Sequence, residues 1–291
     1  MAAHEQSILS RMYFNSYKSA VIVEFLGTAL YVATFALAAL NSNYEMDITD
    51  YSGSHSGASV SNTTRTGTEG TGHFAPMAGG FMLMAVVFAF AYISGGHFNP
   101  CITIATTLIR TNSEPLRWHK ALLYVLAQFA GAFAAVFYAL LTHGTGFPVP
   151  HFAWTGIIEF LRVYLTESVF TFVLASIVLH VSASVQKDNA FYGFATGMGL
   201  MAGSMCVGGI PGGTFNPAHT TALTVVKCFT GQCMPVLHLW IYLSANVIGT
   251  VVAALLYNTV ADAIDPEPAP GEAADAAVAE AAAPEEMKAR E

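Results

Sequence analysis

The 291-residue chain has a formal net charge of −8, and 54% of its residues are hydrophobic while only 10% are charged. A soluble domain typically carries about 25% charged residues, so the charge here is too sparse to cover a surface that faces water on all sides. No basic patch suggests a nucleic-acid partner. The composition therefore excludes an ordinary soluble domain and predicts a protein embedded in a lipid bilayer.

Six apolar stretches are long enough to cross a bilayer as helices, which takes roughly 17–25 residues. They are residues 20–40, 77–93, 121–141, 163–181, 190–207 and 236–260. Two shorter apolar segments, 99–109 and 216–226, each follow a glycine-rich stretch, which predicts half-helices that enter the membrane and turn back. The predicted fold class is an all-α membrane protein with six transmembrane helices and two re-entrant half-helices.

The even number of spans places both chain ends on one side of the membrane. Eight of the eleven basic residues fall on that side, so the positive-inside rule predicts that it is the cytoplasm. We expect a cytoplasmic N-terminus at 1–18, a membrane domain at 19–260 and an acidic, Ala-rich, disordered cytoplasmic tail at 261–291. The polar loop 41–76 would lie outside the cytoplasm, and it contains Asn62 in a glycosylation triplet, a pattern that also arises by chance.

The two halves of the chain repeat one pattern of polar residues within apolar segments. Each half has an acid in its first helix, an Asn-Pro pair at its half-helix and an amide residue in the helix that follows. These are Glu24 and Glu167, Asn99 and Asn216, and Gln128 and Asn246. Because each half has three spans, the halves have opposite orientations, and such an inverted repeat places a binding or transit site at the midplane.

The Asn-Pro pairs suit the start of a helix. Asparagine is a strong N-cap, and proline at the first helical position loses no hydrogen bond. Two such starts entering from opposite faces would aim two positive dipole ends at one point and repel cations there. The alternative, that each pair merely caps a core helix, is favoured for a single copy but not for two copies in an inverted repeat.

These motifs resemble those of the aquaporin and aquaglyceroporin family over residues 19–260. The segment His97-Phe98-Asn99-Pro100-Cys101 resembles the first family signature, with Cys101 where alanine is usual, and Asn216-Pro217-Ala218 matches the second. The resemblance implies a channel domain with one pore per protomer in a homotetramer, passing water and small uncharged solutes such as glycerol, urea or ammonia. It also implies support of the pore loops by four residues, Glu24, His97, Gln128 and Glu167.

The resemblance also places a selectivity filter at Gly79, Leu200, Gly213 and His219. His219 stands where the family usually has arginine, and two of the other positions are glycines, so we expect a wide filter. The segment from Leu200 to Gly203 resembles vacuolar-type members of the family. Counting back from the second Asn-Pro pair instead gives Ser204 as the alternative to Leu200.

The remaining reactive residues predict no further chemistry. The ten histidines lack metal-ligand spacing, no enzyme motif is visible, and we expect no cofactor, metal site or catalytic residue. The four cysteines do not look like a disulfide framework, and Cys101 is the candidate for reaction with mercurials because it lies beside Asn99. Two alternatives stay open: a secondary transporter that uses its intramembrane acids, and a junctional or scaffold protein with a vestigial pore.

Overall fold

The computed structural model describes residues 2–41, 74–110, 116–147, 149–150, 156–207 and 212–264. The side chains of residues 2–16, 40–41, 146 and 261–264 are outside this description. Most of the polar loop, with Asn62, and nearly all of the acidic tail lie outside the described residues.

Helices and short connections make up the whole described part of the chain. The elements are α1 (Ala2–Asn41), α2 (Phe74–Ser94), α3 (Pro100–Leu108), α4 (Trp118–His143), the 3₁₀ turn η2 (Gly144–Gly146), α5 (Ile157–Ser182), α6 (Tyr192–Cys206), α7 (Pro217–Phe229), α8 (Met234–Leu237) and α9 (Leu239–Ile264). Five of them, α1, α2, α4, α5 and α9, are long and apolar enough to cross a membrane. With α6 as a shorter sixth helix of 15 residues, and with the half-helices α3 and α7, the predicted fold class is confirmed.

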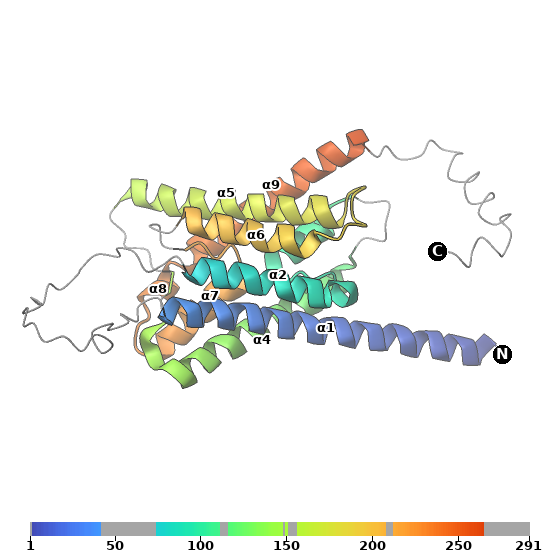
Figure 1. Ribbon diagram of the computed structural model, residues 1–291, viewed down its shortest axis with the longest axis horizontal. Helices are drawn as coiled ribbons and strands as arrows, with labels where there is room; N and C mark the ends of the chain where they lie inside the picture. The colour runs from blue at the N-terminus through green and yellow to red at the C-terminus, as the bar shows by residue number, and fades with distance from the viewer. Residues whose placement is uncertain are drawn as a thin grey trace, which may run out of the picture.

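The long helices form one bundle, and the start of α1 and the end of α9 project from the same end of it (Figure 1). Helix α1 packs against α2 and α4, α5 packs against α6 and α9, and α2 contacts α6. The short α8 lies at the opposite end of the bundle (Figure 1). Glycines allow one close crossing, because a Cβ at Gly197 of α6 would lie 2.4 Å from the carbonyl oxygen of Gly80 of α2. Small residues at helix contacts are the usual means of close packing in membranes.

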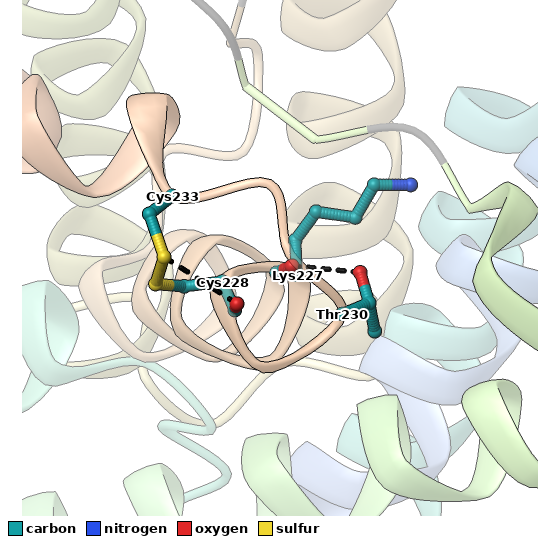
Figure 2. Close-up of a disulfide and its surroundings, with 4 residues drawn as sticks. All are labelled: Lys227, Cys228, Thr230 and Cys233. Carbon is teal, nitrogen blue, oxygen red and sulfur yellow. Dashed lines mark hydrogen bonds between the residues drawn. A yellow bond between two sulfur atoms is a disulfide. The ribbon is translucent and has the colours of Figure 1, made fainter.

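A disulfide joins Cys228 to Cys233 at the C-terminal end of α7 (Figure 2). The turn between them contains Gly231 at φ 93°, a left-handed conformation that favours glycine, and it brings the two Cα atoms to 4.0 Å. The sequence-based prediction that the cysteines form no disulfide was wrong. The pairing depends on a helix end followed by a chain reversal, which cysteine spacing alone does not reveal.

The same end of α7 is also held by Lys227, whose side chain points away from the disulfide (Figure 2). Its Nζ donates hydrogen bonds to the carbonyl oxygens of Phe147, at 3.0 Å, and of Thr145, and it lies over the Phe147 ring. Lys227 is therefore a buried connection between α7 and the segment after α4.

Candidate pore at the junction of two half-helices

Helices α3 and α7 each begin at an asparagine whose side chain caps the helix. Oδ1 of Asn99 accepts a hydrogen bond from the backbone N–H of Cys101 at 2.9 Å, and Oδ1 of Asn216 accepts one from Ala218 at 3.0 Å. A proline follows each asparagine at the first helical position, where its missing N–H costs nothing. The oxygen of each amide is thus used locally, which leaves the nitrogen free to point elsewhere.

The two amide nitrogens reach across to the opposite pore loop. Nδ2 of Asn99 donates to the carbonyl oxygen of Phe215 at 2.8 Å, and Nδ2 of Asn216 donates to the carbonyl oxygen of Phe98 at 3.0 Å. Both phenylalanines have positive φ angles, 49° and 48°, which are uncommon for residues other than glycine. The reciprocal bonds bring the N-termini of the two half-helices together, so their positive dipole ends face one region.

The first pore loop, residues 95–99 between α2 and α3, is held by the buried carboxylate of Glu24 on α1. Its Oε1 accepts hydrogen bonds from the Ser94 hydroxyl at 2.6 Å and the His97 backbone at 3.0 Å. Its Oε2 accepts from the Phe98 backbone at 2.7 Å and from Nε2 of Gln128 at 2.8 Å. Four donors therefore compensate this buried acid, as a charge removed from water requires.

A side-chain network extends this support to α3. Nε2 of Gln128 also donates to the hydroxyl of Thr103 at 2.8 Å, and Nδ1 of His97 lies 3.1 Å from the same hydroxyl. The hydroxyl of Tyr124 donates to the carbonyl oxygen of Ser94 at 2.9 Å. Thr103, Tyr124 and Ser94 were missed by sequence reasoning, although Thr103 lies four residues after Asn99, one helical turn along the same face.

The second pore loop, described over residues 212–216 before α7, is held in an equivalent way by Glu167 on α5. The backbone N–H of Gly213 donates to its Oε1 at 2.5 Å, and Nδ2 of Asn246 donates to its Oε2 at 2.8 Å. The loop lies so close that a Cβ at Gly212 would meet Oε1 of Glu167 at 2.3 Å. Each half thus pairs an acid on its first helix with an amide on its third, as the inverted repeat predicts.

A small cavity lies against the paired asparagines, and its lining combines polar and apolar residues. The polar residues include Asn99, Asn216 and His97. The apolar residues include aliphatic side chains of α2, α3, α5 and α6, which are Leu83, Ile102, Leu174, Val178 and Leu200. Tyr31, Phe98 and Thr196 are the other lining residues. Neither Glu24 nor Glu167 is among the residues that line the cavity in the described part of the chain. A lining of this kind offers hydrogen bonds at few positions, which suits small polar molecules.

The four filter positions have different surroundings. Leu200 lines the cavity, whereas Ser204, the alternative to it, donates a hydrogen bond to the carbonyl oxygen of Gly213 at 2.7 Å. Gly213 has φ 73°, and a Cβ there would lie 2.6 Å from Val207. His219 is fully buried, with Nδ1 3.2 Å from the hydroxyl of Tyr31.

Gly79 does not leave the open space that the sequence suggested. A Cβ at Gly79 would lie 2.3 Å from the ring of Phe35, so that ring already occupies the volume beside the glycine. The space beside Gly79 is therefore filled by a side chain from α1, while the wide filter itself stays a prediction. Sequence reasoning missed Phe35 and Tyr31, although Tyr31 lies two helical turns after Glu24 on the same face of α1.

Cys101 is fully buried and is absent from the described lining of the cavity. Its thiol is therefore not the exposed group at the pore centre that its neighbour Asn99 suggested. Cys206, at the end of α6, is the exposed free cysteine of the described residues.

Comparisons with known proteins agree with this architecture. The sequence model described as "Major intrinsic protein" matches residues 11–257 and 151–286. Similar proteins include "Putative aquaporin NIP4-1" of Arabidopsis thaliana (28% identity, 62% of this chain and 60% of that protein) and "Aquaporin NIP2-2" of Zea mays (31%, 63% and 58%). A third is "Aquaporin-1" of Rhizophagus irregularis, at 32% identity over 62% of each chain. The chain thus spans about 60% of the length of these relatives.

The solved aquaglyceroporin of Plasmodium falciparum has the same fold, with a TM-score of 0.57 at 21% identity over 84% of this chain and 96% of that one. The fold and the junction of half-helices define a multi-pass helical membrane protein built as an inverted repeat. With a family match that covers most of its length, the chain belongs to the major intrinsic protein family.

Proposed function

We propose that this protein is a passive transmembrane channel for water and small uncharged solutes such as glycerol, urea or ammonia. The observation that carries the proposal is the reciprocal pair of bonds from Asn99 to Phe215 and from Asn216 to Phe98, beside a cavity that both asparagines line. Two helix N-termini disfavour cations at this point, while uncharged molecules exchange hydrogen bonds with the polar lining residues. The names of the relatives, which are aquaporins, support the same class.

The surroundings of the two intramembrane acids favour a channel over a secondary transporter. A coupled transporter of a charged solute needs ionisable groups that face its cavity. Glu24 and Glu167 instead accept hydrogen bonds from the pore loops and from amide side chains. The paired asparagines, with a cavity beside them, also favour a working pore over a vestigial one in a scaffold protein.

We also propose that both termini are cytoplasmic and that four copies assemble, each with its own pore. The excess of basic residues at the end of the bundle that carries the termini supports the orientation. The Cys228–Cys233 disulfide lies beyond the C-terminal end of α7, and disulfides persist in oxidising compartments rather than in the cytosol. Protection of a C-terminal tag from protease in intact cells, with cleavage after permeabilisation, tests the orientation; cross-linking in native membranes tests the tetramer.

The channel proposal is tested with purified protein in proteoliposomes. Osmotic shrinkage should be faster than in empty liposomes, with a low activation energy. A tryptophan at Leu174, which lines the cavity, should slow shrinkage to the level of empty liposomes. A tryptophan at Leu165, on the same helix but with 56% of its surface exposed, is the matched control and should leave the rate unchanged. Wild-type rates equal to those of empty liposomes at verified protein content would reject the proposal.

A further inference from the structure

Three aromatic rings meet beside the cavity, and two of them come from α1. The ring centroid of His219 lies 5.0 Å from that of Phe35 and 5.5 Å from that of Tyr31, both in edge-to-face arrangements. Tyr31 and Phe35 are themselves 6.5 Å apart, again edge to face. Such contacts hold aromatic side chains in defined orientations. We call Tyr31, Phe35 and His219 the aromatic layer.

The aromatic layer is continuous with the cavity. Tyr31 lines the cavity, whereas neither Phe35 nor His219 does. Phe35 and His219 both contact the ring of Tyr31, so the layer adjoins the cavity at this residue. Gly79 of α2 makes the arrangement possible, since the Phe35 ring fills the volume that a side chain at Gly79 would need.

The polar group of the layer is the imidazole of His219. Its Nδ1 lies 3.2 Å from the hydroxyl of Tyr31. We assign the Tyr31 hydroxyl as the donor to Nδ1, because a phenol donates more readily than a neutral imidazole, and this assignment leaves the ring proton on Nε2. Nε2 is buried and has no hydrogen-bond partner among the described residues. A buried donor without a partner costs free energy, which an oxygen atom of a passing molecule would recover.

We propose that Phe35 is the size-limiting residue of the pore and that Tyr31 positions His219 to donate from Nε2 to the solute. The aromatic wall of the constriction then comes from α1 instead of from the filter position on α2, which is Gly79. This inference rests on the proposed channel function, and it adds Phe35 and Tyr31, which are outside the four filter positions, to the residues that select the solute.

The test compares glycerol and water permeability in the same proteoliposomes, so that differences in protein content cancel in the ratio. Phe35→Ala should raise the glycerol-to-water ratio on the order of tenfold, because removal of the ring widens the constriction, and Phe35→Leu should give an intermediate rise. Phe25→Ala removes the same ring from a half-exposed position of α1 and should leave the ratio unchanged. The double variant Phe35→Ala with Gly79→Phe returns a ring to the site from α2 and should lower the ratio again.

A separate variant tests the polar part of the proposal. Tyr31→Phe keeps the ring but removes the hydroxyl that holds Nδ1 of His219, and it should lower the glycerol-to-water ratio by about two- to tenfold, the effect of one lost hydrogen bond. An unchanged ratio in both Phe35 variants would overturn the assignment of size selection, and an unchanged ratio in Tyr31→Phe would overturn the positioning role. Water permeability in the wild type, measured in the same experiment, keeps these outcomes distinct from failure of the channel proposal itself.

Discussion

Gly131 on α4 lies so close to Phe25 on α1 that a Cβ added to the glycine would sit 2.3 Å from the carbonyl oxygen of the phenylalanine. The second half of the chain repeats this relationship, since a Cβ at Gly249 of α9 would sit 2.3 Å from the carbonyl oxygen of Ser168 on α5. Each glycine lies one helical turn after the amide residue that bonds the buried acid. The inverted repeat therefore includes the helix crossings that bring each acid to its amide partner.

Substitution of either glycine should separate these helices. We expect Gly131→Ala and Gly249→Ala each to lower the free energy of unfolding by about 1–3 kcal/mol, because the methyl group meets backbone that cannot move independently. Gly199→Ala is the control, since the nearest atom to its Cβ would be the terminal methyl group of the flexible Ile177 side chain, and no backbone atom of another helix is among its closest neighbours. Thermal unfolding in detergent measures all three, and equal midpoints for Gly131→Ala and Gly199→Ala would contradict the prediction.

Asn99 has two separable roles, as helix cap and as donor to the opposite loop. Asn99→Ala should lose both and lower the free energy of unfolding by about 1–2 kcal/mol, together with water permeability. Asn99→Asp keeps the capping oxygen but places a second oxygen against the carbonyl of Phe215, so permeability should fall although the cap remains. Thr107→Ala, which removes a local hydroxyl bond near the end of α3, should leave permeability at the wild-type level.

Both carboxylate oxygens of Glu24 accept hydrogen bonds that hold the first pore loop. Glu24→Gln replaces one oxygen with an NH₂ group that faces donors, which should lower the free energy of unfolding by about 3 kcal/mol. Glu159→Gln removes an acid that is paired with the mostly exposed Arg162, and a surface pair of this kind contributes no more than about 1 kcal/mol. Unfolding midpoints that fall equally in the two variants would show that Glu24 does not hold the pore loop.

The disulfide should be visible in the number of reactive thiols. After denaturation without reductant, a maleimide should label only the two free cysteines, Cys101 and Cys206, and reduction should add Cys228 and Cys233. Cys233→Ser should lower the free energy of unfolding by about 2 kcal/mol, the contribution of closing a short loop. The double variant Cys228→Ser with Cys233→Ser should lower the free energy of unfolding no further than the single change. Four labelled thiols before reduction would show that the disulfide is absent.

Thiol labelling of the folded protein separates the two free cysteines. A thiol reacts only where reagent can reach it, so we expect a maleimide or a mercurial to modify the exposed Cys206 and to leave the buried Cys101 intact. Mass analysis of peptides from the labelled protein locates the modification, and Cys206→Ser should abolish it. Modification of Cys101 at the same rate would show that its side chain reaches the pore after all.

The helices and the paired asparagines could be predicted from the sequence, because they depend on apolar runs and on local helix-capping motifs. Apolar runs of bilayer length must form helices, since no other open structure satisfies its backbone in lipid. Asn99 and Asn216 indicate where the half-helices begin, because asparagine caps a helix with its own side chain and each is followed by a proline. The cavity-lining residues of α2, α5 and α6 were harder to predict, since most residues of these helices are apolar and the sequence does not show which face turns inward.

The sequence by itself determined a membrane protein of six helices with two opposed half-helices, because the solvent and the helix caps act on each segment separately. Only the tertiary structure decided which ring fills the space beside Gly79 and which cysteines pair. Phe35 reaches Gly79 because α1 and α2 cross at that point, and Cys228 reaches Cys233 because the chain reverses after α7. Both outcomes depend on where separate segments come together in space, and such contacts leave no periodic signal in either segment.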